Sequence, residues 1–75
     1  MKKREIQAQL ILRGSNFRQF ALTAEYEPRT VIQAVDRWAG KQELPRGRLT
    51  YRILRDLSKF IGQDVIPGIR MHIEE

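Results

Sequence analysis

This 75-residue chain contains no cysteine. It has only three prolines and five glycines, and aromatic residues make up 8% of it. Without cysteine, neither a disulfide framework nor a thiolate metal site is available. No apolar run approaches the roughly 20 residues that a membrane-spanning helix needs. The basic start, MKKRE, leads into mixed polar sequence and not into the apolar core of a signal peptide. These absences predict a cytoplasmic protein that does not bind membranes.

Catalytic and metal-binding patterns are missing as well. The sequence contains no nucleophile–base pair, phosphate-cradling glycine loop or metal-ligand cluster that spacing would bring together. The nine carboxylates are scattered among basic residues, as on a solvated surface, and the one histidine, His72, has no second ligand. A chain this short also rarely supports an elaborate active site. We therefore expect no enzyme activity, no cofactor, no metal and no small-molecule ligand.

Basic residues outnumber acidic ones, with 14 Lys and Arg against nine Asp and Glu, a net charge of +5 and a pI of about 10.2. This surplus favours a polyanionic partner, because each phosphate contact releases condensed counterions. The same surplus can simply keep a small protein soluble, so charge alone leaves the partner open. The hydrophobic content of 41% allows a single domain, residues 1–75, with a small core.

Residues 16–39 contain two short amphipathic patterns joined by a tight turn. Helical spacing predicts one helix over 17–25 and a second over 28–39, which Pro28 is suited to begin. The apolar or small positions are Phe17, Phe20, Ala21 and Ala24 in the first and Val31, Ala34, Val35 and Trp38 in the second. A connection of about 3–4 residues between such helices is typical of a helix-turn-helix. Tyr26 is expected to fill the turn, and Trp38 to pack in the core.

Further helices are predicted on either side. The first spans 3–13, buries Ile6, Leu10 and Ile11, and ends at Gly14. Asn16 then suits the N-cap of the next helix, with Gln19 at the spacing of a capping box. The last helix, 49–61, ends at Gly62. Its predicted apolar face consists of Leu49, Ile53, Leu54, Leu57, Phe60 and Ile61.

The remaining segments are predicted to be irregular. Residues 40–48 form a basic loop in which glycine and proline disfavour regular structure, although a short β-wing is an alternative. After the last helix, Val65, Ile66 and Ile69 are expected to fold back over the core, with fraying over 70–75. Tyr51 is expected to be half-exposed. The predicted fold is thus a compact all-α helix-turn-helix bundle of about four helices, with a basic loop before the last.

Several sequence motifs resemble those of the small DNA-binding proteins of Mu-like transposable bacteriophages, close to the Ner-type regulators. They are RG-x-x-F-x-x-F-A at 13–21, Y-x-PRTV at 26–31, DRWAGK at 36–41, PRGR at 45–48 and IGQDVIPGI at 61–69. The resemblance implies an all-helical domain whose second motif helix reads DNA in the control of phage transcription or transposition. One departure is Glu25, where such motifs usually carry glycine. The position often favours a positive φ, which costs a non-glycine residue on the order of 1 kcal/mol, so a turn of different shape is expected.

A helix-turn-helix meets base edges with the N-terminal half of its second helix, while the helix before it crosses the DNA backbone. Arginine pairs bidentately with guanine, glutamine with adenine, and apolar groups touch the thymine methyl. Phosphate contacts position such a domain without reading sequence. The candidates for base contacts are therefore Arg29, Thr30, Gln33 and Ile32. The candidates for phosphate contacts are Asn16, Arg18, Arg37, Lys41, Arg46 and Arg48.

Two functions remain open at this stage. The first is sequence-specific binding of double-stranded DNA as a phage or prophage regulator, with a homodimer or paired copies on repeated half-sites. The alternative is a small phage accessory protein that binds and modulates a host protein, which would favour an exposed apolar patch. Ile32, Ile69 and Ile73 are candidates for that patch. Arg29 also has an alternative role as a solvated side chain paired with Glu25 or Asp36.

Overall fold

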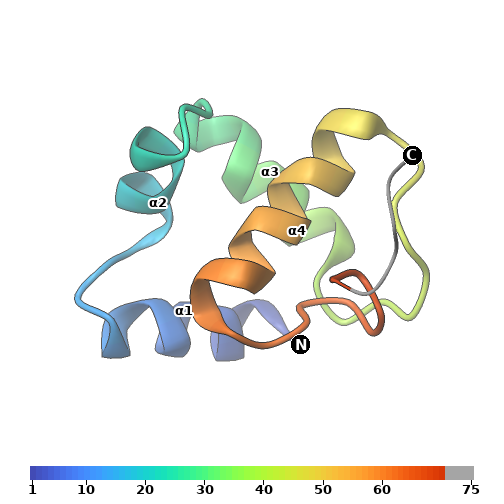
Figure 1. The fold of residues 1–75 in the computed structure, drawn as a ribbon, viewed down its shortest axis with the longest axis horizontal. Coiled ribbons are helices and arrows are strands. Elements are labelled where there is room, and N and C mark those ends of the chain that lie inside the picture. Colours follow the sequence, from blue (N-terminus) through green and yellow to red (C-terminus); the bar gives the residue numbers. More distant parts are fainter. Residues whose placement is uncertain (71–75) are drawn as a thin grey trace.

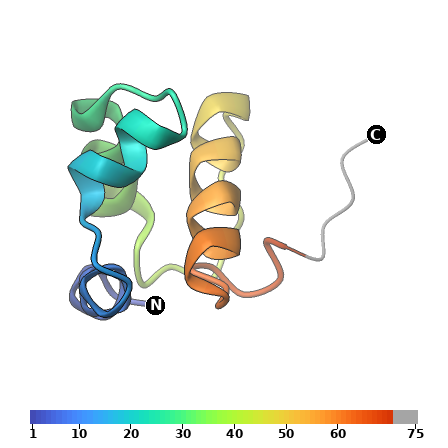
Figure 2. The same ribbon diagram turned by 60° about the vertical axis from the view of Figure 1, so that its left-hand side comes forward.

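Four helices make up the part of the chain that the computed structural model describes, residues 1–70 (Figure 1). They are α1 (Lys3–Leu12), α2 (Phe17–Thr23), α3 (Pro28–Trp38) and α4 (Arg48–Ile61). Residues 1–70 contain no β-strand, so the all-α prediction is confirmed and the connection before α4 carries no β-wing. The helices begin and end within two residues of their predicted bounds. Figures 1 and 2 show α2 and α3 as a pair, with α4 packed along one side of it and α1 across one end.

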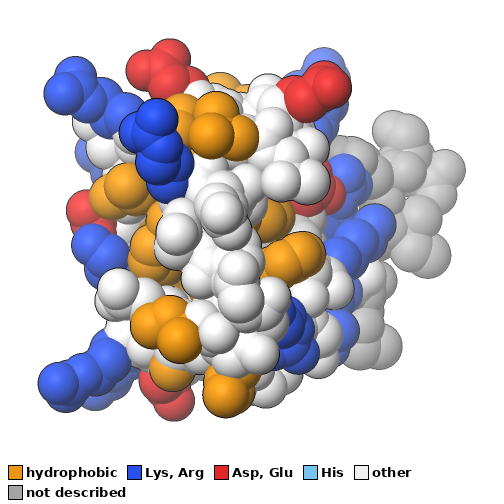
Figure 3. Space-filling model, turned by 90° about the vertical axis from the view of Figure 1, so that its left-hand side faces the viewer, with side chains coloured by type: hydrophobic (Ala, Val, Ile, Leu, Met, Phe, Trp, Pro, Cys, Tyr) orange, Lys and Arg blue, Asp and Glu red, His pale blue; other side chains and the backbone are white. Residues whose placement is uncertain are grey.

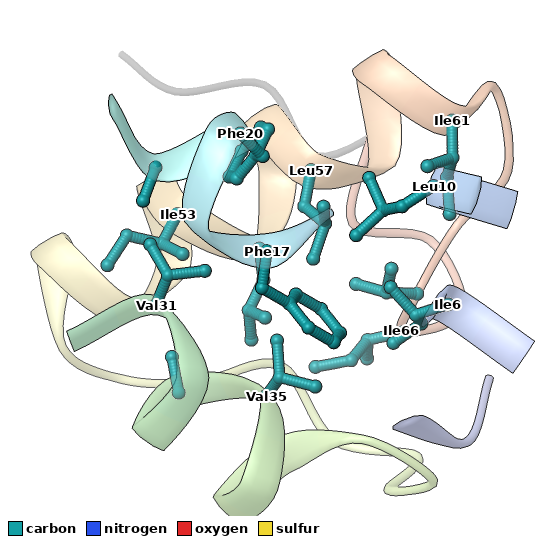
Figure 4. Close-up of a cluster of buried hydrophobic side chains, with 14 of the residues drawn as sticks. Ile6, Leu10, Phe17, Phe20, Val31, Val35, Ile53, Leu57, Ile61 and Ile66 are labelled. Carbon is teal, nitrogen blue, oxygen red and sulfur yellow. The ribbon is translucent and has the colours of Figure 1, made fainter. Parts of the chain in front are cut away.

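The core draws side chains from all four helices and from the segment after α4 (Figure 4). The predicted apolar stripes of α2, α3 and α4 supply most of it, which confirms the periodicities read from the sequence. Its fully buried members include Ile6, Leu10, Val31, Val35, Ile53, Leu57, Ile61 and Ile66. A small four-helix domain of this kind depends on nearly every such residue, because little apolar surface is available for burial.

The segment after α4 folds back over the core, as predicted. Val65, Ile66 and Ile69 are all at most 1% exposed. The hydroxyl of Ser58, itself buried, accepts a hydrogen bond from the Val65 N–H at 3.0 Å and donates to the carbonyl one turn earlier in α4 at 2.8 Å. The Tyr51 hydroxyl donates to the Ile69 carbonyl at 3.1 Å. Tyr51 is therefore buried, and the prediction that it is half-exposed is wrong because the returning segment covers it.

The end of the chain lies partly outside the described residues. Arg70 is within them, and its Nε donates to Asp64 Oδ1 at 2.5 Å. The rest of the tail predicted to fray, 71–75 with His72 and Ile73, falls outside.

Some apolar side chains that were assigned to the core are exposed. Ile11, Leu49 and Phe60 are 62%, 51% and 42% exposed. Successive residues of a helix are rotated by about 100° around its axis, so Ile11 faces a different side of α1 from Ile6 and Leu10. Leu49 and Phe60 likewise lie at one edge of the broad α4 stripe. Trp38 is only half-buried, packed against the core from the last turn of α3.

Candidate nucleic-acid interface

The turn between α2 and α3 is held by contacts of Tyr26 with α2 and with α4. Within it, the Tyr26 N–H donates to the Ala21 carbonyl at 2.7 Å, and the Tyr26 ring lies 6.5 Å from that of Phe20. The Tyr26 hydroxyl donates to Asp56 Oδ2 on α4 at 2.6 Å. Burial, as the larger cause, and this hydrogen bond, as the next, raise the pKa of Tyr26 well above its ordinary value. The half-buried Tyr26 thus fills the turn, as predicted, and also ties it to α4.

Glu25 takes the backbone conformation that glycine would take at this turn. Its φ is +65°, in the left-handed region, and it is the one non-glycine residue with positive φ within 1–70. An L-residue in this region costs about 1–2 kcal/mol. The expectation that Glu25 gives the turn a different shape is therefore wrong: the residue accepts the strained conformation.

Asn16 fixes the start of α2. Its Oδ1 accepts a 2.8 Å hydrogen bond from the Gln19 N–H, which confirms the predicted N-cap. The cap therefore fixes where α2 begins. The connection into α3 is held instead by the contacts of Tyr26, because Glu27, which precedes α3, makes no side-chain cap hydrogen bond.

α3 presents a line of polar side chains away from the core. Arg29, Gln33 and Arg37 are all exposed and follow each other at intervals of four residues. Successive members are about 6 Å apart along the axis and shift by about 40° around it. No carboxylate within residues 1–70 lies within ion-pair distance of either arginine. We call Arg29, Gln33 and Arg37 the α3 line.

The acidic residue of α3, Asp36, is paired with a lysine of another helix. Asp36 Oδ1 pairs with Lys3 Nζ of α1 at 2.7 Å. The alternative in which Arg29 pairs with Asp36 or Glu25 is not observed. The Lys3–Asp36 pair is exposed and contributes little to stability, but it reduces the negative charge beside the α3 line.

The other two candidates for base contacts are less accessible. Thr30 and Ile32 are half-buried on the two flanks of α3, and Ile32 packs against the core. Ile69, an alternative apolar contact residue, is fully buried and so cannot form part of an exposed patch.

The candidates for phosphate contacts are all exposed and are spread over three helices and the connection between α3 and α4. Asn16 and Arg18 lie at the start of α2, and Arg37 in the last turn of α3. Lys41 and Arg46 lie in the connection between α3 and α4, and Arg48, predicted in that connection, is the first residue of α4. Figure 3 shows the face that carries α2 and one end of α1, with Lys and Arg side chains toward its edges and apolar side chains between them.

A second line of cations was missed in the sequence. Arg48, Arg52, Arg55 and Lys59 follow each other on the outer face of α4 at intervals of four, three and four residues. That spacing keeps them on one side of a helix, and it could have been read from the sequence. We call these four residues the α4 basic stripe. Figures 1 and 2 show that the outer face of α4 points away from α3, so the stripe and the α3 line lie on different sides of the domain.

Comparisons with protein-family models, with curated proteins and with solved structures found no match to this chain. Within residues 1–70, no helix is long and apolar enough to span a membrane. The same residues contain no group of three or more acidic or histidine side chains placed to hold a metal ion.

Proposed function

We propose that this protein binds double-stranded DNA in a sequence-specific manner through α3. The observation that carries the proposal is the α3 line. Its side chains are exposed, and its two arginines form no ion pair within 1–70. The turn before α3 is tied to α4 by the hydrogen bond between Tyr26 and Asp56, which fixes the position of the helix. A recognition helix needs both properties, because base contacts require free polar groups at a defined angle to the groove.

The side chains of the α3 line suit different parts of a duplex. Arg29, in the first turn of α3, can pair bidentately with guanine, and Gln33 can pair with adenine one turn further on. Arg37, about 12 Å along the axis from Arg29, is placed for a phosphate where the helix leaves the groove. Arg18, Lys41 and Arg46 would add backbone contacts that orient the domain, whereas Arg48 belongs to the α4 basic stripe on another side.

The resemblance to the Ner-like proteins of Mu-like phages supports a narrower role. On that basis the protein is a transcriptional regulator of a phage or prophage, acting at the bacterial nucleoid. One α3 offers a small recognition surface, so we further propose paired copies on repeated half-sites. Half-site spacing of about one helical turn would then appear in the operator.

Enrichment of random duplexes by the purified protein tests this proposal. A specific reader recovers a defined motif, and the spacing of its repeats reports whether copies bind in pairs. The affinity for the recovered motif should fall with salt, by a slope of roughly −0.9 in log K against log[salt] for each phosphate contact. Recovery of no motif, together with no binding to any duplex at low salt, would contradict the proposal.

A further inference from the structure

An apolar groove lies between α2 and α4, away from the α3 line. Its volume is about 320 Å³. Its walls include Phe20 and Thr23 from α2, Ala24 directly after α2, and Lys59 and Phe60 from α4. The rings of Phe20 and Phe60 are 5.9 Å apart. Phe60 is 42% exposed, so an apolar side chain that entered the groove would cover it. A volume near the lower end of the range for ligand pockets, about 300–1,000 Å³, suits one or two such side chains.

Cations border this groove. Lys59 belongs both to its wall and to the α4 basic stripe, which continues along α4 from its C-terminal to its N-terminal end. Arg48, Arg52 and Lys59 have no carboxylate within ion-pair distance among residues 1–70. The acidic residue in the groove wall, Asp56, accepts the Tyr26 hydroxyl at 2.6 Å and pairs with Arg55 of the stripe at 3.5 Å, which leaves Arg48, Arg52 and Lys59 as the exposed cations of the stripe. The groove and the stripe therefore combine an apolar anchor site with adjacent positive charge.

The combination of an apolar groove with adjacent positive charge suits some binding partners better than others. A second copy of the chain docked symmetrically through α4 would place the two basic stripes against each other, and like charges in contact are disfavoured. A DNA backbone would use the stripe but would leave the apolar groove unfilled. An acidic segment with apolar residues on one face would use both features.

We infer that the α2–α4 groove and the α4 basic stripe form a docking surface for an acidic amphipathic segment of another protein. One or two large apolar side chains of that segment enter the groove beside Phe60. Its carboxylates then lie along α4 opposite Lys59 and Arg52, the exposed members of the stripe nearest to the groove. This inference does not depend on DNA binding by α3, and the two surfaces can be occupied together.

The probes for a test are three synthetic peptides of equal length. The first carries Leu and Phe at helical spacing on one face and Glu elsewhere, the second replaces Leu and Phe by Ser, and the third replaces Glu by Lys. Titration into ¹⁵N-labelled protein should give about tenfold tighter binding of the first peptide than of either control. The shifted amides should include Thr23, Ala24 and Phe60, while those of Arg29 and Gln33 stay unchanged.

Variants separate the groove from the stripe. Thr23→Phe fills the groove from an exposed position, and Arg52→Glu reverses a charge of the stripe; each should weaken the first peptide by about tenfold. Arg37→Glu, on α3, is the matched charge-reversal control and should leave the affinity unchanged. Unfolding curves of all three variants show whether each still folds.

Three results would overturn the inference. The first peptide could bind no tighter than the serine peptide, its shifts could map to α3, or a DNA duplex could move the α4 amides more than any peptide does. The last result would assign the stripe to nucleic acid. The first two results leave the recovery of a DNA motif untouched. The third is separated from a failure of the proposed function by Arg29→Ala, which still weakens motif binding if α3 reads the DNA, so the two failures are distinguishable.

Discussion

The Tyr26 hydroxyl donates a 2.6 Å hydrogen bond to Asp56 Oδ2, and this contact joins the turn between α2 and α3 to the middle of α4. The two residues are 30 positions apart in the chain. The turn sets the angle at which α3 projects. The hydrogen bond therefore links the stability of the bundle to the orientation of the exposed face of α3. A hydrogen bond to a charged, half-buried acceptor should be one of the stronger polar contacts of the domain.

A double-mutant cycle measures this contact. Tyr26→Phe should lower the free energy of unfolding by about 1–2 kcal/mol, because Asp56 keeps its charge and loses its donor. Asp56→Asn should also destabilise, and the two losses should not add, since both remove the same interaction. Urea unfolding of the four proteins gives the coupling energy. Strict additivity would show that the contact contributes nothing.

Stability at high pH should depend on the same phenol. The pKa of Tyr26 is raised above its ordinary value by burial and by the bond to Asp56. A raised pKa means that the folded state holds the proton more tightly, so the stabilisation is complete below about pH 10 and is lost as the pH rises through the folded-state pKa. The difference in unfolding free energy between the unsubstituted protein and Tyr26→Phe should thus be constant from pH 7 to about 9.5 and shrink above it. A difference that grows above pH 10 would contradict this.

Glu25 should be a site where glycine stabilises the protein. Removing the Cβ at φ +65° relieves about 1–2 kcal/mol of strain, while glycine adds entropy to the unfolded chain. Glu25→Ala is the matched control, because it removes the same carboxylate but keeps the Cβ. We expect Glu25→Gly to be more stable than Glu25→Ala by about 0.5–1 kcal/mol, the reverse of their usual order. Equal or reversed stabilities would show that this turn stores no strain.

The segment after α4 should behave as part of the core. Ile66→Ala should cost about 2–4 kcal/mol, because Ile66 is fully buried and the change leaves a cavity. Leu12→Ala removes a comparable side chain that is 76% exposed, and its effect should stay within about 0.5 kcal/mol. Chemical denaturation of both variants makes the comparison. Similar losses at the two positions would mean that the segment does not pack as described.

Periodicity predicted the helices well, because Val31, Ala34 and Val35 repeat at an interval that only a helix buries on one side. The Asn16 cap also followed from local sequence. Burial of Tyr51 could not be predicted in this way, since it depends on the returning segment that covers it. The bond between Tyr26 and Asp56 is equally nonlocal.

The candidate site was predicted in part. The exposure of Arg29, Gln33 and Arg37 followed from the same helical pattern that buries Val31 and Val35. The α4 basic stripe was not predicted, although its four residues recur at helical spacing opposite the apolar face of that helix. The Lys3–Asp36 pair joins two helices whose contact the sequence does not specify, so its effect on the α3 line appeared only in the structure.

Titration of Arg29→Ala, Arg37→Ala and Arg52→Ala against the recovered motif and a scrambled duplex tests the central claim most directly. Arg29→Ala should lose about 1–3 kcal/mol on the motif and bring specific and non-specific binding closer together, because a base contact is removed. Arg37→Ala should weaken both duplexes alike and reduce the salt slope by about one unit, as loss of a phosphate contact does. Arg52→Ala, an arginine on the outer face of α4, should leave both affinities nearly unchanged. If Arg52→Ala instead abolishes binding while Arg29→Ala has no effect, α4 and not α3 meets the DNA, and the account is wrong.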